Sequence, residues 1–198
     1  MKGREAYGRA FARRFGVEEA PALVSKTLRK SEVAATYLRQ YAPTYELSDP
    51  QPLEDAYFAS YVMLDNPSFQ LWEDGRAVRE APVLAGQTTF IDLRLAPVML
   101  VNNQMDALHF YIPRAAFNAV TDNAGVARIG DLVHEHGRGA DDPAMQALSA
   151  ALMPAFNAPD QASRLFIDYV TLAVVAHNPP AFAASCFHRC VTPVAPTW

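Results

Sequence analysis

The sequence predicts an α+β fold in which an antiparallel β-structure is followed by helices, and two observations carry this prediction. From about residue 31 to residue 113, apolar and polar residues alternate with a period of two, as in strands that bury one face. After Ile112 the apolar residues recur every 3.6 positions, as they do along a helix. Several short strands at this spacing are typical of an antiparallel sandwich or a barrel.

An N-terminal arm over residues 1–30 precedes the strands. Residues 1–16 are expected to form a short amphipathic helix, because Tyr7, Phe11 and Phe15 are spaced four residues apart. Gly16 follows as a C-cap. Residues 1–40 contain nine lysines and arginines and four acidic residues, whereas the chain as a whole has a net charge of −4. The basic arm either docks on an acidic surface or is simply solvated, and both interpretations stay open.

The predicted strands lie between residues 31 and 113 and are separated by turn signals such as Asn66-Pro67 and Asn102-Asn103. They are residues 32–40, 55–64, 68–72, 88–93, 98–101 and 107–112. Asp74-Gly75 is typical of a type I′ hairpin, since both of its central residues need a positive φ.

The region from residue 114 to residue 177 is predicted to be helical. Pro113 suits a first helical position, and residues 123–125 can end that helix. Asp142-Pro143 begins a second helix, which buries the stripe of Met145, Leu148, Leu152 and Phe156. Pro154 is expected to end or bend this helix near Met153.

A last helix starts at Pro159-Asp160 and carries Leu165, Tyr169, Leu172 and Ala176 on one stripe. This stripe either covers the sheet or forms the seam of a homodimer, and the two interpretations stay open. Pro179-Pro180 is expected to stop the helix, so residues 178–198 are predicted to be an irregular tail.

Composition and motifs exclude several classes of protein. The fraction of apolar residues, 51%, and of charged residues, 19%, is that of a globular domain. No apolar signal-peptide core follows Met1, and the longest strongly apolar stretch, residues 169–176, is too short to cross a bilayer. Two cysteines cannot form a disulfide framework, so we expect a cytoplasmic protein without a membrane partner. The acidic net charge argues against nucleic-acid binding by the chain as a whole.

Two histidine- or cysteine-containing clusters are candidates for metal sites, and neither is complete. His134-Glu135-His136 has no third ligand at a suitable spacing, and Cys186-x-His188-x-Cys190 has three ligands where a structural zinc needs four. We therefore predict no metal and no cofactor. Glycine-rich phosphate loops and a G-x-S-x-G nucleophile elbow are also missing from the sequence.

Aromatic residues on the predicted strands are the best candidates for a ligand site. A barrel lined by some of them would suit an apolar or aromatic effector held by a few polar groups. His109 and Tyr111 share one strand face, which can point inward to a ligand or outward to solvent. The predicted ligand-binding residues are Tyr57, Tyr61, Trp72, His109 and Tyr111.

Several short runs resemble the regulatory domain of AraC-type transcriptional regulators, over about residues 20–177. These runs are residues 108–116 (LHFYIPRAA), 71–76 (LWEDGR), 92–94 (DLR), Asp142-Pro143 and 165–173 (LFIDYVTLA). The resemblance implies a cupin-like antiparallel β-barrel of the jelly-roll type over residues 31–113, which senses a small molecule. It also implies a small C-terminal helical bundle over residues 114–177 that forms a homodimer, and it implies no catalysis.

The chain departs from this family after His177. The 21 residues that follow contain one basic residue and several prolines, so they do not resemble a helix-turn-helix domain. We therefore expect a truncated regulator that does not itself bind DNA. The alternative is a cupin-like enzyme, an isomerase or a dioxygenase, acting inside the barrel with His109 as the first candidate for an acid or base.

Overall fold

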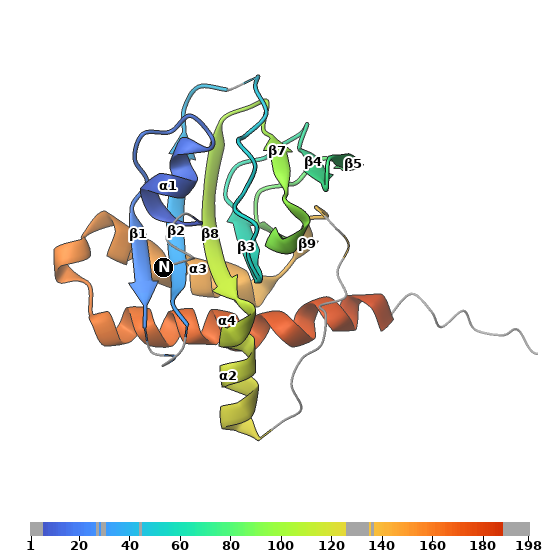
Figure 1. The fold of residues 1–198 in the computed structure, drawn as a ribbon. Coiled ribbons are helices and arrows are strands. Elements are labelled where there is room, and N and C mark those ends of the chain that lie inside the picture. Colours follow the sequence, from blue (N-terminus) through green and yellow to red (C-terminus); the bar gives the residue numbers. More distant parts are fainter. Residues whose placement is uncertain are drawn as a thin grey trace, which may run out of the picture.

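The computed structural model describes residues 6–26, 28, 31–43, 45–125, 135 and 137–187 (Figure 1). The helices are α1 (Gly8–Arg13), α2 (Arg114–Ala124), α3 (Pro143–Asn157) and α4 (Arg164–Phe187), with 3₁₀ turns at Leu93–Leu95 and Pro159–Gln161. The strands are β1 (Ala22–Ser25), β2 (Val33–Gln40), β3 (Ala56–Val62), β4 (Gln70–Glu73), β5 (Arg76–Glu80), β6 (Gln87–Asp92), β7 (Val98–Leu100), β8 (Met105–Pro113) and β9 (Ala140–Asp141).

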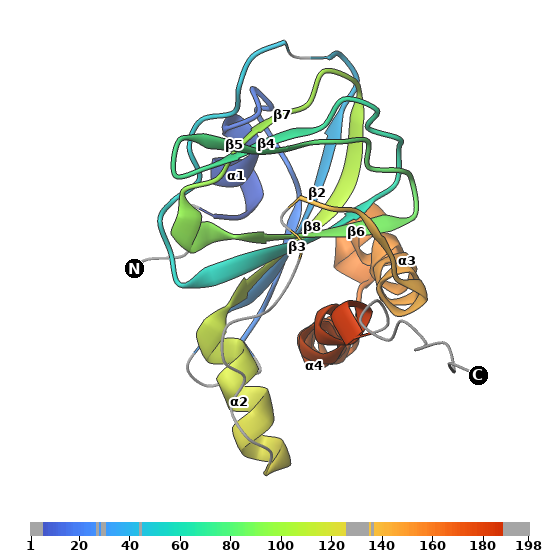
Figure 2. The same ribbon diagram turned by 90° about the vertical axis from the view of Figure 1, so that its right-hand side faces the viewer.

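The strands form two antiparallel sheets that face each other (Figure 2). The larger sheet has six strands in the order β1-β2-β8-β3-β6-β9, and the smaller has three in the order β5-β4-β7. We call the space between them the cup. The predicted closed barrel is not observed among the described residues, because β4 pairs only with β5 and β7 and so does not join the larger sheet. The α+β class is confirmed, with the strands preceding the main helices.

Each face of the six-stranded sheet has its own hydrophobic core. The core on the cup side is built from the inward residues of both sheets together with Phe11 of α1 and Phe15, which follows that helix. The core on the other face is closed by α2, α3 and α4, through residues such as Phe117, Met145 and Val174. Figure 2 shows this order as three layers, with the small sheet and α1 on one side of the large sheet and the helices on the other.

Local sequence signals explain several of the turns and helix ends. Asp74 and Gly75 have φ values of 48° and 74°, and they join β4 to β5 as the predicted hairpin. Asp142 accepts hydrogen bonds from the backbone N–H groups of Ala144 and Met145, which caps the N-terminus of α3. Gly125 ends α2 in the left-handed conformation, with a φ of 66°.

Three strands were not predicted: β1 in the N-terminal arm, β5 after the hairpin turn, and β9 in the region predicted to be helical. β1 lies inside the arm and pairs with β2, so residues 1–30 contribute an edge strand as well as a helix. β5 follows the predicted hairpin turn, and β9 adds a short edge next to β6. Both β1 and β9 are short, and a strand of two to four residues leaves too little alternation to be recognised.

The predicted helix end at Pro179-Pro180 was wrong, and of the two outcomes expected at Pro154, an end or a bend near Met153, the end is not observed. α3 continues through Pro154 to Asn157, and α4 continues through Pro179-Pro180 to Phe187. The fixed φ of proline is itself helical, so a proline within a helix removes one N–H donor and crowds the preceding turn without forcing the chain to leave the helix. The predicted boundary at residue 177 is therefore not a helix end.

None of the helices in the described part of the chain has the length and apolar character that crossing a membrane requires.

Candidate functional site

A narrow, mainly apolar cavity lies in the cup. Its volume is about 40 Å³, which is room for a few water molecules. Both sheets, Phe15 after α1 and the loops between strands contribute to its wall. The lining residues are Phe15, Ser60, Val62, Leu64, Asn66, Phe69, Val83, Thr89, Ile91, Met99, Val101, Gln104, Met105, Asp106, Ala107 and His109.

A row of four buried polar residues crosses the cup face of the large sheet. Thr36 of β2 is opposite His109 of β8, His109 is opposite Ser60 of β3, and Ser60 is opposite Thr89 of β6. The rows on either side are almost wholly apolar: one contains Ala34, Tyr111, Phe58 and Ile91, and the other contains Leu38, Ala107 and Val62. The polar row therefore gives an otherwise apolar cup a band of hydroxyl and imidazole groups.

His109 is the centre of this row. Its Nδ1 lies 2.8 Å from Oγ of Ser60, and its Nε2 is buried without a hydrogen-bond partner. Burial lowers the pKa of His109 to about 3, so the ring is neutral at pH 7. A neutral imidazole has one donor and one acceptor nitrogen, and the bond to Ser60 uses only one of them. The other nitrogen can bond to a molecule in the cavity.

α1 packs onto the cup face and closes part of it. Phe11 is fully buried, and its ring meets His109 edge-on with the centroids 4.8 Å apart. The N–H of Gly8 donates to Oγ1 of Thr36 over 2.8 Å, which fixes the start of α1 to the end of the polar row. Gly8 has a φ of 60°, and a Cβ atom there would lie 3.3 Å from Cβ of Ala22. Glycine is therefore required at this close approach between α1 and β1.

The charged groups at the cavity are few. Among the described residues that line it, Asp106 is the one charged group, and its carboxylate lies 3.3 Å from Nε of Arg39. Tyr37 lies near Asp106, on the face of the large sheet that the helices cover. Burial and the carboxylate of Asp106 raise the pKa of the Tyr37 hydroxyl. Neither an arginine nor a lysine belongs to the described lining.

The structure separates the predicted ligand-binding residues. Of the five, only His109 lines the cavity. Tyr111 shares its face but lies toward Tyr7, and its hydroxyl donates to Glu54. Burial and this carboxylate raise the pKa of the Tyr111 hydroxyl. Trp72 is half-buried in β4 and does not line the cavity.

Tyr57 and Tyr61 are outside the cup for a simple reason. They alternate along β3 with Phe58 and Ser60, which face the cup, so both tyrosines belong to the opposite face of the sheet. The ring of Tyr57 packs there against Phe90 and Phe117, in the core closed by the helices.

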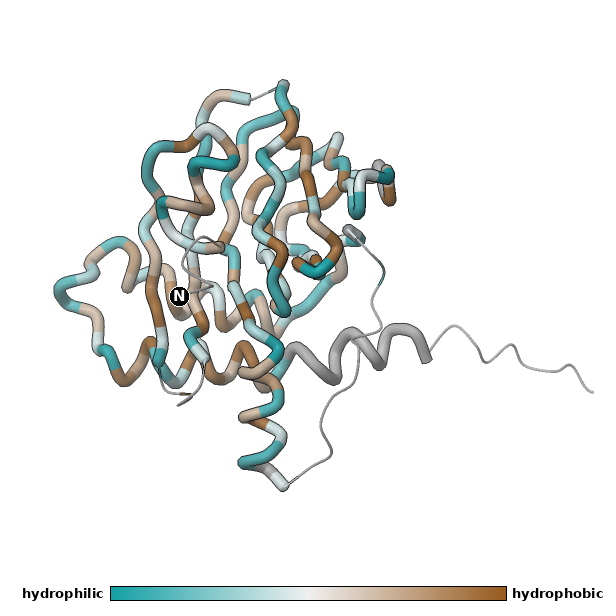
Figure 3. The backbone as a smooth tube through the Cα atoms, viewed as in Figure 1, coloured by the Kyte–Doolittle hydropathy of each residue, from teal (hydrophilic) through white to brown (hydrophobic). Residues whose placement is uncertain are grey.

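The predicted dimer stripe lies at the exposed start of α4. Leu165 and Tyr169 are 65% and 61% exposed, and the neighbouring Phe166 is 47% exposed. Leu172 is half-buried, and Ala176 is exposed. The buried face of α4 carries Ile167, Thr171, Val174 and Val175 instead. Figure 3 shows both hydrophobic and hydrophilic positions along the coloured part of this helix.

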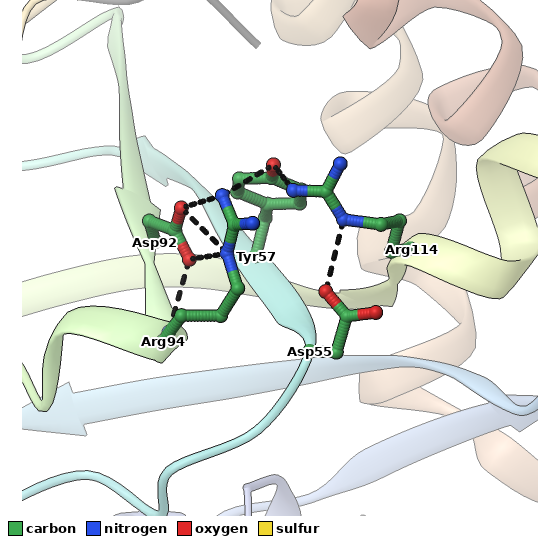
Figure 4. A network of polar contacts seen from close by, with 5 residues as sticks. All are labelled: Asp55, Tyr57, Asp92, Arg94 and Arg114. Carbon is green, nitrogen blue, oxygen red and sulfur yellow. Dashed lines mark hydrogen bonds and ion pairs between the residues drawn. The ribbon is translucent and has the colours of Figure 1, made fainter. Parts of the chain in front are cut away.

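A second polar cluster surrounds the hydroxyl of Tyr57 (Figure 4). Arg114 donates to this hydroxyl over 2.5 Å and Arg94 over 3.4 Å, and both guanidinium groups lie over the tyrosine ring. Arg94 pairs with Asp92 and Arg114 with Asp55. Two carboxylates balance two guanidinium groups, so the cluster joins β3, β6 and the start of α2 without excess charge.

Sequence reasoning missed Ser60, Met99 and Met105 as cavity residues. Ser60 lies 49 positions from His109, and only the register between β3 and β8 brings them together. The alternation of Phe58, Ser60 and Val62 shows that these residues share a face, but it does not say which face is concave.

No group of three or more potential ligands for a metal ion occurs among the residues that the structure describes. His134, His136, His188 and Cys190, which belong to the two incomplete clusters in the sequence, lie outside the described residues.

No protein-family model matches this sequence, and no curated protein matches it either. Several solved structures are similar. The AraC-like transcriptional activator CuxR has 10% sequence identity and a TM-score of 0.45, over 90% of this chain and 59% of CuxR. A cupin 2 conserved barrel domain protein from Salinispora arenicola has 14% identity and a TM-score of 0.32, over 54% of this chain and 83% of that protein.

Oxalate decarboxylase from Bacillus subtilis is also similar, with 14% identity and a TM-score of 0.33 over 56% of this chain and 33% of the enzyme. The chain thus spans less than two thirds of the length of CuxR and of the decarboxylase. An AraC-like activator and cupin proteins are both among these similar structures.

These comparisons correct one prediction. The resemblance to AraC-type regulators led us to expect no catalysis, with a cupin-like enzyme as the alternative, but the similar structures include an enzyme, oxalate decarboxylase. A cup of this kind does not by itself separate a binding domain from an enzyme. The exclusion of catalysis was therefore wrong as stated.

Proposed function

We propose that this chain is the small-molecule-binding and dimerisation domain of a transcriptional regulator of the AraC type. The short runs between residues 71 and 173 that resemble this family motivate the type of regulator. The physical support comes from two features of the molecule, a cavity inside the cup and an apolar surface on α4.

The cavity supports the binding of a small molecule. Its wall is mostly apolar, with a few polar groups that can fix the orientation of a ligand, which is the usual composition of a ligand site. Met99 and Met105 belong to the wall, and methionine side chains adapt readily to the shape of a guest. The space can therefore widen beyond its present volume without a change of fold.

The observation that carries the proposal is the exposed apolar surface at the start of α4. Leu165, Phe166 and Tyr169 follow one another around less than two turns, and all three are largely exposed. Large apolar side chains that gather on one exposed helix face are typical of an interface. A second copy of α4 would cover this surface, because a two-fold dimer brings the same patch of each chain together.

Sedimentation equilibrium of the full chain tests the dimer. We expect a mass of twice 21.8 kDa for the unmodified chain and 21.8 kDa for the double variant Leu165→Glu/Tyr169→Glu. Leu53→Glu is the matched control, because Leu53 is 70% exposed but lies in the loop before β3. This control should remain dimeric. A monomeric unmodified chain at all concentrations, or a double variant that still dimerises, would contradict the proposal.

One observation favours a second function, that of a cupin-like enzyme. The 2.8 Å contact between Ser60 and His109 joins a hydroxyl to an imidazole at the wall of the cavity, as in sites of nucleophilic catalysis. The low pKa of His109 weighs against it, because a ring with a pKa of about 3 is a weak base at pH 7. Labelling with a serine-directed phosphonylating reagent, followed by mass spectrometry, tests this function: modification of Ser60 in the unmodified chain that is lost in His109→Leu would favour the enzyme, and an unreactive Ser60 would contradict it.

A further inference from the structure

From the polar row we infer the chemical class of the ligand: an uncharged molecule with a short apolar body and one hydrogen-bonding group, which bonds to His109 in the cup. This inference rests on the proposed function in one respect, that the cavity is where the ligand binds. It adds the charge, the size and the polar contact that the ligand must have.

The polar contact follows from the unpartnered nitrogen of His109. The ring is 8% exposed, lines the cavity and has no partner for Nε2. A buried polar atom without a partner costs free energy, and a ligand that bonds to it removes that cost. The contact with Ser60 fixes the other ring nitrogen, so the imidazole presents Nε2 in one orientation.

The absence of charge follows from the wall of the cavity. An anionic ligand would find no arginine or lysine among the described lining residues. A cationic ligand would find only Asp106. Its side chain alternates with Met105 and Ala107, which face the cup, and so lies on the other face of the sheet beside Arg39. Moving an unpaired charge from water into such an environment is strongly unfavourable, whereas a hydroxyl or carbonyl group needs only a hydrogen bond.

The small size and apolar body follow from the rows beside His109 and from the opposite sheet. Phe58 and Ile91 lie on one side of the polar row and Val62 and Ala107 on the other, with Met99 facing them from β7. A ligand of a few heavy atoms fills this space with modest movement of the two methionines. Its apolar part gains contact with both sheets.

Methyl NMR of the full chain with ¹³C-labelled methionine tests the inference. The sequence has six methionines. Met99 and Met105 line the cavity, whereas the buried Met145 belongs to the core on the other face of the sheet and serves as an internal control. The probes are isobutanol, isobutyrate and isobutylammonium, which share one carbon skeleton and differ in charge at pH 7.

We expect isobutanol to shift the methyl signals of Met99 and Met105 saturably and to leave Met145 unchanged. The two ionised probes should bind at least ten-fold more weakly. Equal or tighter binding of isobutyrate or isobutylammonium would overturn the ligand class while leaving the cavity as a binding site. No shift with isobutanol would overturn the inference as a whole. The proposed dimer would not be affected by that result, because sedimentation equilibrium tests it separately.

Variants of the polar row complete the test. His109→Leu and Ser60→Ala should each weaken isobutanol binding several-fold or more, the first by removing the polar atom and the second by freeing the ring. If His109→Leu does not fold, the affinity of Ser60→Ala for isobutanol decides whether the ligand bonds to His109. Thr171→Val is the matched control, since it removes a buried hydroxyl without a partner from α4, outside the cavity. Unchanged affinity in Ser60→Ala and in a folded His109→Leu would contradict the role of His109.

Discussion

Phe11 of α1 and His109 of β8 meet edge to face at a centroid distance of 4.8 Å, although 98 positions separate them in the chain. Phe11 also packs against Phe15 and Phe58, at 5.2 Å and 4.9 Å. The six-residue α1 is too short to be stable alone. Its position therefore depends on these aromatic contacts and on the hydrogen bond from Gly8 to Thr36.

Phe11→Ala should destabilise the fold by about 3–5 kcal/mol, because it removes a fully buried aromatic ring and leaves a cavity. Urea denaturation followed by circular dichroism measures this loss. Tyr45→Ala removes an aromatic ring that is 78% exposed and lies outside α4, and it should cost less than about 0.5 kcal/mol. Similar losses in the two variants would show that α1 does not pack as described.

The stability of the fold should depend on pH through His109. Its pKa is about 3 in the folded chain and 6.5 as the unperturbed value, so between these values the unfolded chain binds a proton that the folded chain does not. The contribution of neutral His109 to the free energy of unfolding is therefore fully present above pH 6.5. It is lost as the pH falls toward 3, at up to about 1.4 kcal/mol per pH unit.

Denaturation from pH 7 to pH 4 measures this dependence as the difference between the unmodified chain and His109→Leu. The variant should lose less stability as the pH falls, and carboxylates common to both chains cancel in the difference. Ser60→Ala keeps the imidazole and should retain most of the slope. Parallel curves for the unmodified chain and His109→Leu would mean that the ring is protonated in the folded state.

Asp142 links two helices and should be sensitive to substitution. Its carboxylate caps α3 and lies 2.9 Å from Nε2 of His177 on α4. Asp142→Ala loses both contacts and should destabilise the chain by about 1–2 kcal/mol, whereas Asp142→Asn keeps a capping oxygen and should lose less. Thermal denaturation of both variants, with the exposed Asp160→Ala as control, measures this order. An alanine variant as stable as the asparagine variant would exclude a role for the cap.

Gly125 should resist replacement for reasons of backbone conformation alone. Its φ is 66°, and a Cβ atom built there meets nothing within 4 Å. Gly125→Ala should therefore cost roughly 1–2 kcal/mol, the usual penalty for a residue with a Cβ in the left-handed region. Chemical denaturation measures the cost. A gain in stability would mean that α2 does not end in this conformation.

The local signals in the sequence were the reliable ones. Asp74-Gly75 predicted a hairpin, Asp142-Pro143 a helix start, and both are observed. Each depends on the conformational preference of two or three adjacent residues, which tertiary contacts seldom override. The expected stop at Pro179-Pro180 failed, and α3 does not end at Pro154, because a proline removes one N–H donor and crowds the preceding turn without forcing the chain to leave the helix.

The site could be predicted only in part. Alternation along β8 correctly placed His109 and Tyr111 on one face of the sheet. Tyr57 and Tyr61 also share a face of their strand, β3, but it is the face that the helices cover. Which face is concave depends on the pairing of β3 with β8 and on the small sheet above them, and both are non-local. The partner of His109, Ser60, had no signal in the sequence for the same reason.

The most direct measurement is the set of intermolecular nuclear Overhauser effects between isobutanol and the methyl groups of the full chain. Contacts from the alcohol to both Met99 and Met105, with none to Met145, would place the guest in the cup beside His109. Contacts confined to surface methyls, or contacts to Met145 alone, would contradict a ligand site between the two sheets.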